Sequence, residues 1–479
     1  MTSGAVAAVD LGATSGRVIV GTVGPNQLAI RTVTRFANTP VRTIDGLHWN
    51  VLELYRSALQ GLGTALREEP GISSIGIDSW AVDYALMRGE RMLGTPFHYR
   101  DERTARGVEA AHTLVPPAEL YARNGLQFLP FNSLYQLTTD RLDGVLQLAN
   151  TALLIPDLFA YWLTGRAVAE RSNASTTGLL SVRSGTWDAE LLARLKLPAS
   201  VLPPLVDAGT RIGELLPAVA AELGATRPID VVAVGSHDTA SAVLAVPMRA
   251  ERAAYISCGT WGLVGLELEA PVLSEAAREA NFTNEGGVDG TVRFLHNVMG
   301  LWLLSESVRQ WERESGETID LGALLAAASA VSTRVARFDV NDPRFLTPGD
   351  LPARLAEFCS ERSLPVPASR AEFVRSIIES LADAFAHAVR TAAALAGCTV
   401  EEVHIVGGGS QNELLCQLTA DRLGLPVLAG PVEATALGNV LVQARAQGFV
   451  SGGLEQLRAL VARSFEPRRY EPKLASVPA

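Results

Sequence analysis

The chain has 479 residues, of which 48% are hydrophobic and 19% are charged, and its formal net charge is −10. This length predicts two or three domains, and the composition is that of a globular protein. The acidic balance argues against nucleic acid or an anionic membrane as a partner, so any phosphate group must meet a local cluster of donors.

The N-terminal residues are not predicted to be a signal peptide, because they lack a basic segment and reach Asp10 before an apolar segment could develop. No uninterrupted apolar run approaches the roughly 18 residues that a membrane helix requires. The cysteines are scattered, with no C-x-x-C pair, which predicts reduced thiols in a cytoplasmic protein. They are Cys258, Cys359, Cys398 and Cys416.

Several nucleotide-binding classes are excluded by missing motifs. The only lysines are Lys196 and Lys473, and neither follows a glycine-rich loop, so there is no P-loop. The motif set of the protein kinases is absent as well. The segment GGGSQN at 407–412 has Asn412 where the dinucleotide-binding fingerprint requires a third glycine.

The chain opens with a strand over 5–9, a turn of small residues over 13–16 and a return strand over 18–23. Successive backbone N–H groups in such a turn form an anion-binding nest. Asp10 and Arg17 flank the turn, and Asp10 would repel a phosphate unless a divalent cation lay between them, which implies magnesium. A plain β-hairpin with a solvated Asp10 and Arg17 explains the same pattern.

Further elements follow in order. A third strand is predicted over 28–36, a helix over 52–66, a strand over 75–77, a loop feeding a helix from 127, and a helix over 156–165. The strand over 75–77 runs into Asp78-Ser-Trp-Ala-Val-Asp83, whose polar and aromatic residues indicate a ligand wall, although Trp80 also suits a core. The charged run YRDERT over 99–104 is predicted to be a solvated face.

The segment VVAVGSHDTAS over 231–241 is the strongest catalytic candidate. A short buried strand ends at Gly235, polar residues follow, and a helix is predicted over 240–246. In an open α/β sheet, a titratable residue at this position faces the crevice beyond the carboxyl end of the strand. Asp238 would therefore face a cleft; the alternative is that Asp238 only caps the helix.

After a predicted boundary near 247–251, the opening pattern recurs. A strand over 253–257, a turn CGTW over 258–261 with a hydroxyl at Thr260, and a return strand over 262–268 follow one another. Two such hairpins, each opening an α/β domain, suggest a duplicated architecture with a nucleotide held between the halves.

The second half also contains predicted helices over 297–312 and 369–397, the latter with a capping box of Ser369 and Glu372. A strand over 403–406, a glycine turn over 407–409 and a helix over 412–423 come next, before a final helix from 432. The glycines would let the backbone approach a flat ligand closely, although a tight turn without a ligand explains them too.

Three motifs in order, DLGATSGR, SCGTWG and IVGGGSQN, resemble the two phosphate motifs and the adenosine motif of the superfamily that joins sugar kinases, actin and heat-shock ATPases. SHDTASAV resembles the catalytic segment of the FGGY carbohydrate kinases. The strings IGIDSWAVDY, LQFLPFNSLYQL, NVMGLWLL and GPVEATALGN are most similar to the rhamnulokinase branch of that family, and the resemblance runs from about residue 5 to about residue 445.

The resemblance implies an α/β fold with two RNase H-like domains, 1–246 and 247–479, flanking an interdomain nucleotide cleft, and it implies ATP and Mg²⁺ as cofactors. Asp238 matches the catalytic base, and Asp10 would hold the magnesium ion through water. The matching ATP contacts are Ala13, Thr14, Ser15, Gly16, Arg17, Thr260, Ser305 and Gly408, and the matching sugar contacts are Ala81, His237, Asp238, Thr239 and Asn297. Two residues depart from the family pattern: Ala81 stands in place of glycine, and Ser305 in place of a glutamine that touches ATP.

The implied activity is phosphorylation of a ketose, L-rhamnulose, at its C1 hydroxyl by a cytoplasmic monomer or homodimer. A kinase for another ketose, such as L-fuculose or a pentulose, is the main alternative. A different class, an actin-like or chaperone-like ATPase, would not need the SHDT segment. A metal phosphohydrolase built on His237 and Asp238 is disfavoured, because no other histidine stands at ligand spacing.

Overall fold

The computed structural model describes residues 2–473, and the contacts in it divide the chain into two compact units. The first unit comprises the chain up to Pro247 together with Glu267–Phe294 and Ala434–Phe465, and the remaining segments form the second unit. The two added segments of the first unit lie beyond the boundary predicted after Val246. Within residues 2–473, no helix combines the length and the apolar character that crossing a bilayer requires.

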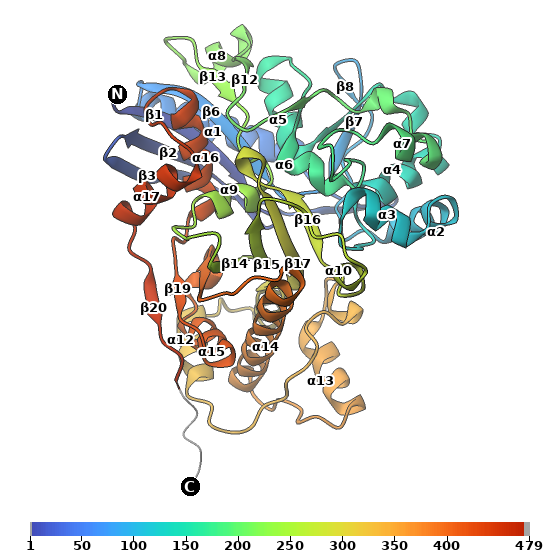
Figure 1. The fold of residues 1–479 in the computed structure, drawn as a ribbon, viewed down its shortest axis with the longest axis vertical. Coiled ribbons are helices and arrows are strands. Elements are labelled where there is room, and N and C mark those ends of the chain that lie inside the picture. The colour runs from blue at the N-terminus through green and yellow to red at the C-terminus, as the bar shows by residue number, and fades with distance from the viewer. Residues whose placement is uncertain (1, 474–479) are drawn as a thin grey trace. The chain divides into compact units, whose positions relative to one another are not determined.

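A mixed sheet forms the centre of the first unit, with strand order β12-β13-β6-β1-β2-β3 (Figure 1). β1 pairs antiparallel with β2, and β6 and β13 continue the sheet parallel to β1 and to β6. The strands are β1 (Gly4–Leu11), β2 (Ser15–Gly24), β3 (Gln27–Ala37), β6 (Ile72–Ser79), β12 (Arg211–Glu214) and β13 (Asp230–Val232). The central strand β1 is buried almost throughout, as expected of an apolar strand covered on both faces.

Helices cover both faces of this sheet. Val18 and Gly21 of β2 point to opposite faces, because side chains alternate along a strand. A Cβ placed on Gly61 of α1 (Val51–Glu68) would touch Val18, whereas a Cβ placed on Gly21 would touch Val440 of α16 (Ala434–Ala446). Helix α16 therefore returns from near the end of the chain to pack against the N-terminal strands (Figure 1).

The first unit also carries a peripheral layer with its own apolar core. Short strands β7 (Tyr84–Arg88), β8 (Arg91–Met92) and β9 (Thr151–Leu154) form one small sheet, and β10 (Ala169–Glu170) pairs with β11 (Leu205–Val206). The other elements of the unit are β4 (Val41–Thr43), β5 (Gly46–His48), β16 (Thr283–Gly286), α2 (Ala105–Leu114), α3 (Pro117–Asn124), α4 (Ser133–Leu142), α5 (Ile155–Thr164), α6 (Arg171–Ala174), α7 (Ala189–Leu195), α8 (Pro217–Leu223), α9 (Asp238–Leu244), α10 (Glu275–Glu279) and α17 (Leu454–Ser464).

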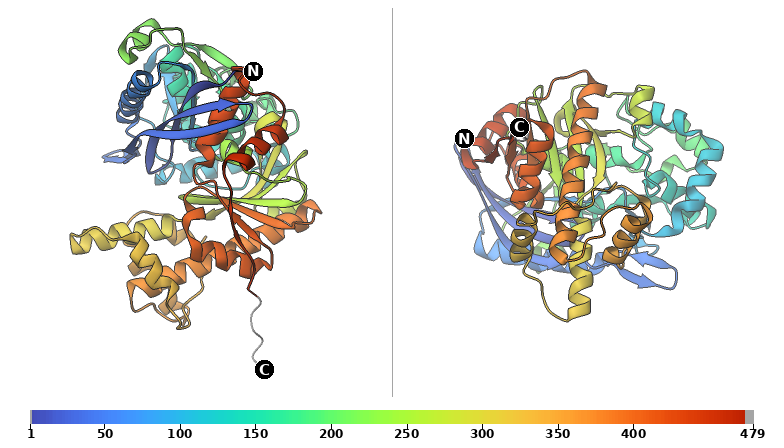
Figure 2. Two further views of the ribbon diagram at one scale, coloured as in Figure 1. Left: turned by 90° about the vertical axis from the view of Figure 1, so that its left-hand side faces the viewer. Right: turned by 90° about the horizontal axis from the view of Figure 1, so that it is seen from below.

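The second unit repeats this layout. Its neighbouring strands run in the order β17-β15-β14-β18-β19-β20, with β14 and β15 antiparallel and β18 and β19 parallel to β14 and to β18. The long helix α14 packs against α12 and α15 (Figure 2). The elements are β14 (Ala253–Cys258), β15 (Trp261–Leu268), β17 (Val292–Met299), β18 (Glu402–Val406), β19 (Val427–Ala429), β20 (Arg468–Tyr470), α11 (Trp302–Ser315), α12 (Leu321–Ser329), α13 (Leu351–Glu361), α14 (Arg370–Ala396) and α15 (Glu413–Leu423). The last two residues of β15 and the first three of β17 are assigned to the first unit.

Two predictions for the second half are wrong in part. The helix predicted over 297–312 begins only at Trp302, and the residues before it form β17, so Asn297 lies on a strand. Gly300 separates the two elements because its backbone passes against Trp261, where a Cβ would lie 2.4 Å from the main-chain carbon. The helix predicted from 432 is present as α16, but α17 follows it, so α16 is not the final helix.

The charged run over 99–104 does not form a solvated face. Tyr99, Arg100 and Thr104 are buried, and Arg103 forms an ion pair with Asp140 of α4. Charge alone does not expose a side chain when a partner of opposite sign is available in the interior.

Helix α16 packs closely against α9, the helix that begins at Asp238. A Cβ on Gly438 would lie 1.9 Å from the carbonyl oxygen of Ser241 in α9. Only glycine permits this approach of two backbones.

We expect Gly438→Ala to lower the melting temperature by roughly 2–10 °C, since overpacking costs about 1–3 kcal/mol. Alanine ordinarily stabilises a helix by about 1 kcal/mol relative to glycine. A lower melting temperature in this variant would therefore come from the steric clash and not from helix propensity. Gly94→Ala is the matched control, because a Cβ there meets nothing within 4 Å. Thermal unfolding followed by circular dichroism measures both variants, and equal melting temperatures would contradict the close packing.

Candidate functional site

The first hairpin presents a buried carboxylate that is paired with a guanidinium. Asp10 and Arg17 face each other across β1 and β2, and the Nε and Nη2 atoms of Arg17 lie 2.8 and 2.7 Å from Oδ2 of Asp10. The side chain of Asp10 is only 4% exposed. The alternative in which both residues are solvated is therefore wrong, because Asp10 is buried and ion-paired with a partly buried Arg17.

The turn itself is held in a fixed shape. The N–H of Gly12 donates to the carbonyl of Ser15 (2.9 Å). Asn38 braces the turn twice: its backbone N–H donates to the carbonyl of Thr14 (3.0 Å), and its side-chain amide donates to the carbonyl of Gly12 (2.9 Å). Thr14 and Ser15 are exposed, while Gly16 is buried against Phe36. The turn thus offers polar groups at the surface on a braced backbone, as an anion-binding loop requires.

A second carboxylate stands beside Asp10. Asp78 on β6 is the parallel register partner of Asp10, is fully buried, and accepts a hydrogen bond from the Asn439 amide of α16 (2.6 Å). Burial, reinforced by the charge of Asp10, raises the pKa of Asp78 well above its usual value. The sequence indicated a ligand wall at Asp78 but no role for this residue, although an aspartate that ends a buried strand was a usable signal.

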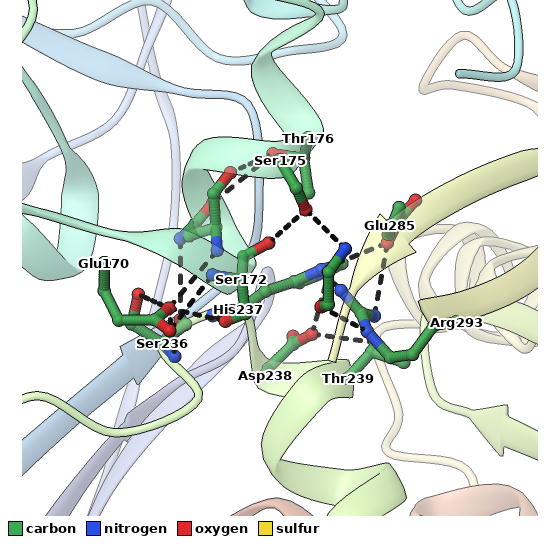
Figure 3. Close-up of polar contacts among 12 residues, drawn as sticks. Glu170, Ser172, Ser175, Thr176, Ser236, His237, Asp238, Thr239, Glu285 and Arg293 are labelled. Atoms are coloured by element: carbon green, nitrogen blue, oxygen red, sulfur yellow. Dashed lines mark hydrogen bonds and ion pairs between the residues drawn. The ribbon is translucent and has the colours of Figure 1, made fainter. Parts of the chain in front are cut away.

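The end of β13 is anchored by a buried glutamate. Glu170 accepts hydrogen bonds from the backbone N–H (3.0 Å) and the hydroxyl (2.9 Å) of Ser236, and it caps α6 through the N–H of Ser172 (3.0 Å). The N–H of Ser79 donates to the carbonyl of Ser236 (2.9 Å), which joins this segment to the end of β6. Glu170 fixes the segment that carries His237 and Asp238 (Figure 3).

Asp238 is the first residue of α9, and its carboxylate accepts a hydrogen bond from the Thr239 side chain. The N-cap residue is His237, so the capping alternative for Asp238 is wrong. The Asp238 side chain is 31% exposed, its Oδ1 accepts a hydrogen bond from the Thr239 hydroxyl (3.0 Å), and Nε2 of His237 lies 3.5 Å from the same oxygen. The structure therefore leaves this carboxylate at the surface of the strand ends, neither embedded in the core nor used as a cap.

Three carboxylates consequently gather at the carboxyl ends of three neighbouring parallel strands. Asp10 lies near the end of β1, Asp78 lies near the end of β6, and Asp238 follows β13. The charges of Asp10 and Asp238 both act on Asp78. This edge is where open α/β sheets bind their ligands.

The end of β6 continues into a tight turn. Asp83 N–H donates to the carbonyl of Ala81 (2.9 Å), and Val82 at the centre has a φ of 67°, a conformation that a β-branched residue rarely adopts. The Val82 carbonyl accepts hydrogen bonds from Ser133 and Gln136 of α4. Strain of this kind persists only where the surroundings hold it, and it clusters at ligand sites.

Asp83 organises the aromatic residues beside this turn. Its carboxylate accepts hydrogen bonds from the indoles of Trp49 (2.6 Å) and Trp80 (3.1 Å), from Gln136 (2.8 Å) and from the Tyr99 N–H (3.1 Å). Burial raises the pKa of Asp83 to about 7 in spite of these donors. Trp80 is only 5% exposed, so it belongs to the core, as the second of the two sequence interpretations held.

Behind His237 lies an ion pair that the sequence did not indicate. Arg293 of β17 is fully buried and donates from Nη2 to Nδ1 of His237 (3.0 Å), and Glu285 of β16 lies 3.2 Å from Nη1 of Arg293 (Figure 3). Burial alone would raise the pKa of Glu285, but the charge of Arg293 and the contact with His237 bring that pKa below its usual value. Both residues are scattered charges in the sequence, and only folding brings them to His237.

The remaining sequence-predicted residues belong to the second unit. Thr260 lies in the turn from β14 to β15, where its carbonyl accepts from the N–H of Trp302 (3.1 Å), and Ser305 is exposed on α11. Gly408 is exposed after β18, in a turn that Gly407 begins with a φ of 80°. A Cβ on Gly409 would meet Cys258, so these glycines serve close packing within the unit as well.

Comparison with known proteins assigns both parts of the chain to one family. Residues 5–245 match the N-terminal domain, and residues 254–447 the C-terminal domain, of the FGGY family of carbohydrate kinases. The chain is 44% identical to a rhamnulokinase of Pectobacterium carotovorum over 480 residues, covering 98% of this chain and 94% of that protein. It is 38% identical to a rhamnulokinase of Bacteroides thetaiotaomicron over 469 residues, covering 97% and 95%.

Solved structures agree on the fold. The gluconate kinase of Lactobacillus acidophilus superposes with a TM-score of 0.77 at 15% identity, covering 98% of this chain and 94% of that one. The xylulose kinase of Rhodospirillum rubrum gives 0.73 at 19% identity, covering 99% and 95%. With both family domains matched and the curated relatives aligned along almost the whole chain, the protein belongs to the FGGY family of carbohydrate kinases, in its rhamnulokinase branch.

Proposed function

We propose that the protein transfers the γ-phosphoryl group of MgATP to the C1 hydroxyl of L-rhamnulose and releases ADP and L-rhamnulose 1-phosphate. The relatives named rhamnulokinase support the choice of sugar, since they match this chain over 97–98% of its length. The observation that carries the chemistry is the position of Asp238, a partly exposed carboxylate on a braced strand end.

Asp238 acts as the general base. The sugar O1 attacks the γ-phosphorus, the bond from that phosphorus to the β,γ-bridging oxygen breaks, and the proton of O1 passes to the carboxylate. In a loose, metaphosphate-like transition state the hydroxyl becomes acidic late, so the main task of Asp238 is to orient it. A carboxylate held at a helix start and not consumed by capping suits this task.

The phosphates are assigned to the first hairpin and the adenosine to the second unit. Backbone N–H groups over 13–17 would neutralise phosphate charge, together with Arg17, which Asp10 holds at the base of the turn. Thr260, Ser305 and Gly408 complete the proposed nucleotide contacts, and the short side chain of Ser305 replaces the longer amide of the family.

The residues present suit magnesium held mainly by its substrate. In the described part of the chain, no group of three or more histidine, cysteine, aspartate or glutamate side chains is placed to hold a metal ion. Mg²⁺ typically takes one or two carboxylates and completes its shell with phosphates and water, so Asp10 would suffice as the protein's contribution. The ion would supply charge neutralisation at the phosphates.

His237, Thr239, Asn297 and Ala81 are proposed to contact the sugar. Ala81 belongs to the strained turn after β6, where the contact would come from its backbone, which explains why alanine can replace glycine there. The cysteines Cys258, Cys359, Cys398 and Cys416 are free thiols, in keeping with a cytoplasmic location. A monomer or a homodimer remains the proposed assembly.

We expect L-rhamnulose to be phosphorylated with a kcat/KM that exceeds those of L-fuculose and pentuloses by roughly tenfold or more, because a site fitted to one sugar discriminates against hydroxyl and methyl changes. A coupled ADP-release assay over the ketose panel measures this. A higher kcat/KM for another ketose would contradict the assignment of L-rhamnulose as the substrate. ADP release at the same rate with and without sugar would point to the actin-like ATPase class.

Replacement of Asp238 by asparagine is expected to reduce kcat for L-rhamnulose by roughly 10²–10⁴-fold, because the base is lost while the shape is kept. ATP binding, measured by calorimetry, should change little. Asp207→Asn, at an exposed aspartate paired with Arg171, is the control and should retain the wild-type rate. A variant at position 238 with near-normal turnover would remove this residue from the role.

Asp10→Asn is expected to raise the magnesium concentration needed for half-maximal velocity, because a neutral amide is a weaker ligand than a carboxylate. The amide oxygen can still accept from Arg17, so the hairpin should persist. Velocity titrated with MgCl₂ at fixed ATP measures the effect, and an unchanged half-maximal concentration would contradict the assignment of Asp10.

A further inference from the structure

A buried charge cluster lies behind the histidine that precedes the proposed base. Arg293 is 0% exposed and Glu285 is 6% exposed, and both reach the Nδ1 atom of His237, at 3.0 Å and 3.3 Å. The other ring nitrogen, Nε2, lies 3.5 Å from Oδ1 of Asp238 (Figure 3). One imidazole therefore connects a buried ion pair to the carboxylate proposed for catalysis.

The two neighbours of Nδ1 make opposite demands on it. A guanidinium stays protonated and only donates, so Arg293 requires a lone pair on Nδ1, whereas the Glu285 carboxylate only accepts and favours a proton there. Arg293 makes the closer contact. With Nδ1 as acceptor, the neutral ring carries its proton on Nε2, the ring nitrogen that lies 3.5 Å from Oδ1 of Asp238.

Glu285 makes the buried arginine tolerable. An uncompensated charge in the interior is costly, and the carboxylate 3.2 Å from Nη1 balances it. The lowered pKa of Glu285 keeps this partner ionised. Arg293 is also anchored through Nε to the carbonyl of Gly286 (3.0 Å), so its Nη2 atom is directed at one place.

We propose that Arg293 and Glu285 are positioning residues that fix His237 in the Nε2–H tautomer, so that its N–H orients the Asp238 carboxylate and keeps it ready to accept the proton of the sugar hydroxyl. This inference rests on the proposed function only for the role of Asp238. The tautomer itself is a property of the folded protein.

The contacts in this cluster predict that the ring proton of His237 moves when Arg293 is replaced. With glutamine at position 293, Glu285 becomes the dominant neighbour of Nδ1 and draws the proton onto it. Nε2 then presents a lone pair to Asp238, and two acceptors repel each other. A wrong tautomer of a catalytic imidazole is known to be costly even where the geometry is intact.

The direct test is nuclear magnetic resonance of the full chain labelled with ¹⁵N-histidine. The signals of His237 are assigned by comparison with His237→Gln, and long-range ¹H–¹⁵N correlations distinguish the tautomers. We expect Nε2–H in the wild type and Nδ1–H, or a doubly protonated ring, in Arg293→Gln. A wild-type ring protonated on Nδ1, or an unaltered Nε2–H tautomer in Arg293→Gln, would overturn the proposal.

Kinetics provide the second readout. Arg293→Gln should lower kcat for L-rhamnulose about tenfold or more with an unchanged KM for ATP, and Arg293→Lys, which keeps a charged donor, should recover part of the loss. Arg458→Gln is the matched control, because Arg458 is also buried and paired with a carboxylate, Glu267 (2.6 Å), but does not contact His237. It should lose stability and retain kcat.

The outcomes separate the two proposals. Equal losses of kcat in Arg293→Gln and Arg458→Gln would show a general effect of stability and overturn the positioning role, while Asp238→Asn would still report on the base. A wild type that fails to phosphorylate L-rhamnulose would overturn the proposed function, and the tautomer measurement would still decide the role of Arg293.

Discussion

The parallel alignment of β1, β6 and β13 is the constraint on which the site depends, because it brings carboxylates to adjacent strand ends. Like charges so placed repel one another, and each needs its own compensation. Asp10 is paired with Arg17, and Asp78 accepts from Asn439 and has a raised pKa. Asp238, by contrast, remains partly exposed. The carboxylates thus acquire different properties from their surroundings, which suits different chemical tasks.

Helix α16, which is distant in the sequence, supplies hydrogen-bond partners to buried polar groups of the N-terminal sheet. Gln443 donates to the carbonyl of Ala7 (3.0 Å) and to Asn439 (2.6 Å), and the Ser74 hydroxyl donates to Gln443 (2.8 Å). These two amides lie on α16 and are fully buried, so each polar group requires a partner. The absence of a side chain at Gly438 lets this helix approach closely enough to serve both β6 and α9.

The buried charges around His237 are also compensated by nearby partners. Glu285 and Arg293 come from strands that follow the predicted boundary, yet they pack in the first unit. Their opposite charges compensate each other, so the interior tolerates them. Both residues also contact the same ring nitrogen of His237. Glu170 performs the corresponding structural task for Ser236, where a single carboxylate satisfies both the backbone and the hydroxyl.

Sequence patterns alone predicted the strands of the two hairpins, the strand end that carries Asp238 and the long helix α14, because alternation, glycine stops and capping residues act over short distances. Motif resemblance extended this to the family, which the comparisons confirmed. The folded structure was needed to see that Tyr99, Arg100 and Thr104 are buried, that Asn297 lies on a strand, and that Glu285 and Arg293 reach His237. Each of these depends on a partner remote in the chain, whether an opposite charge, a parallel neighbour or a close backbone, and local pattern carries no information about such a partner.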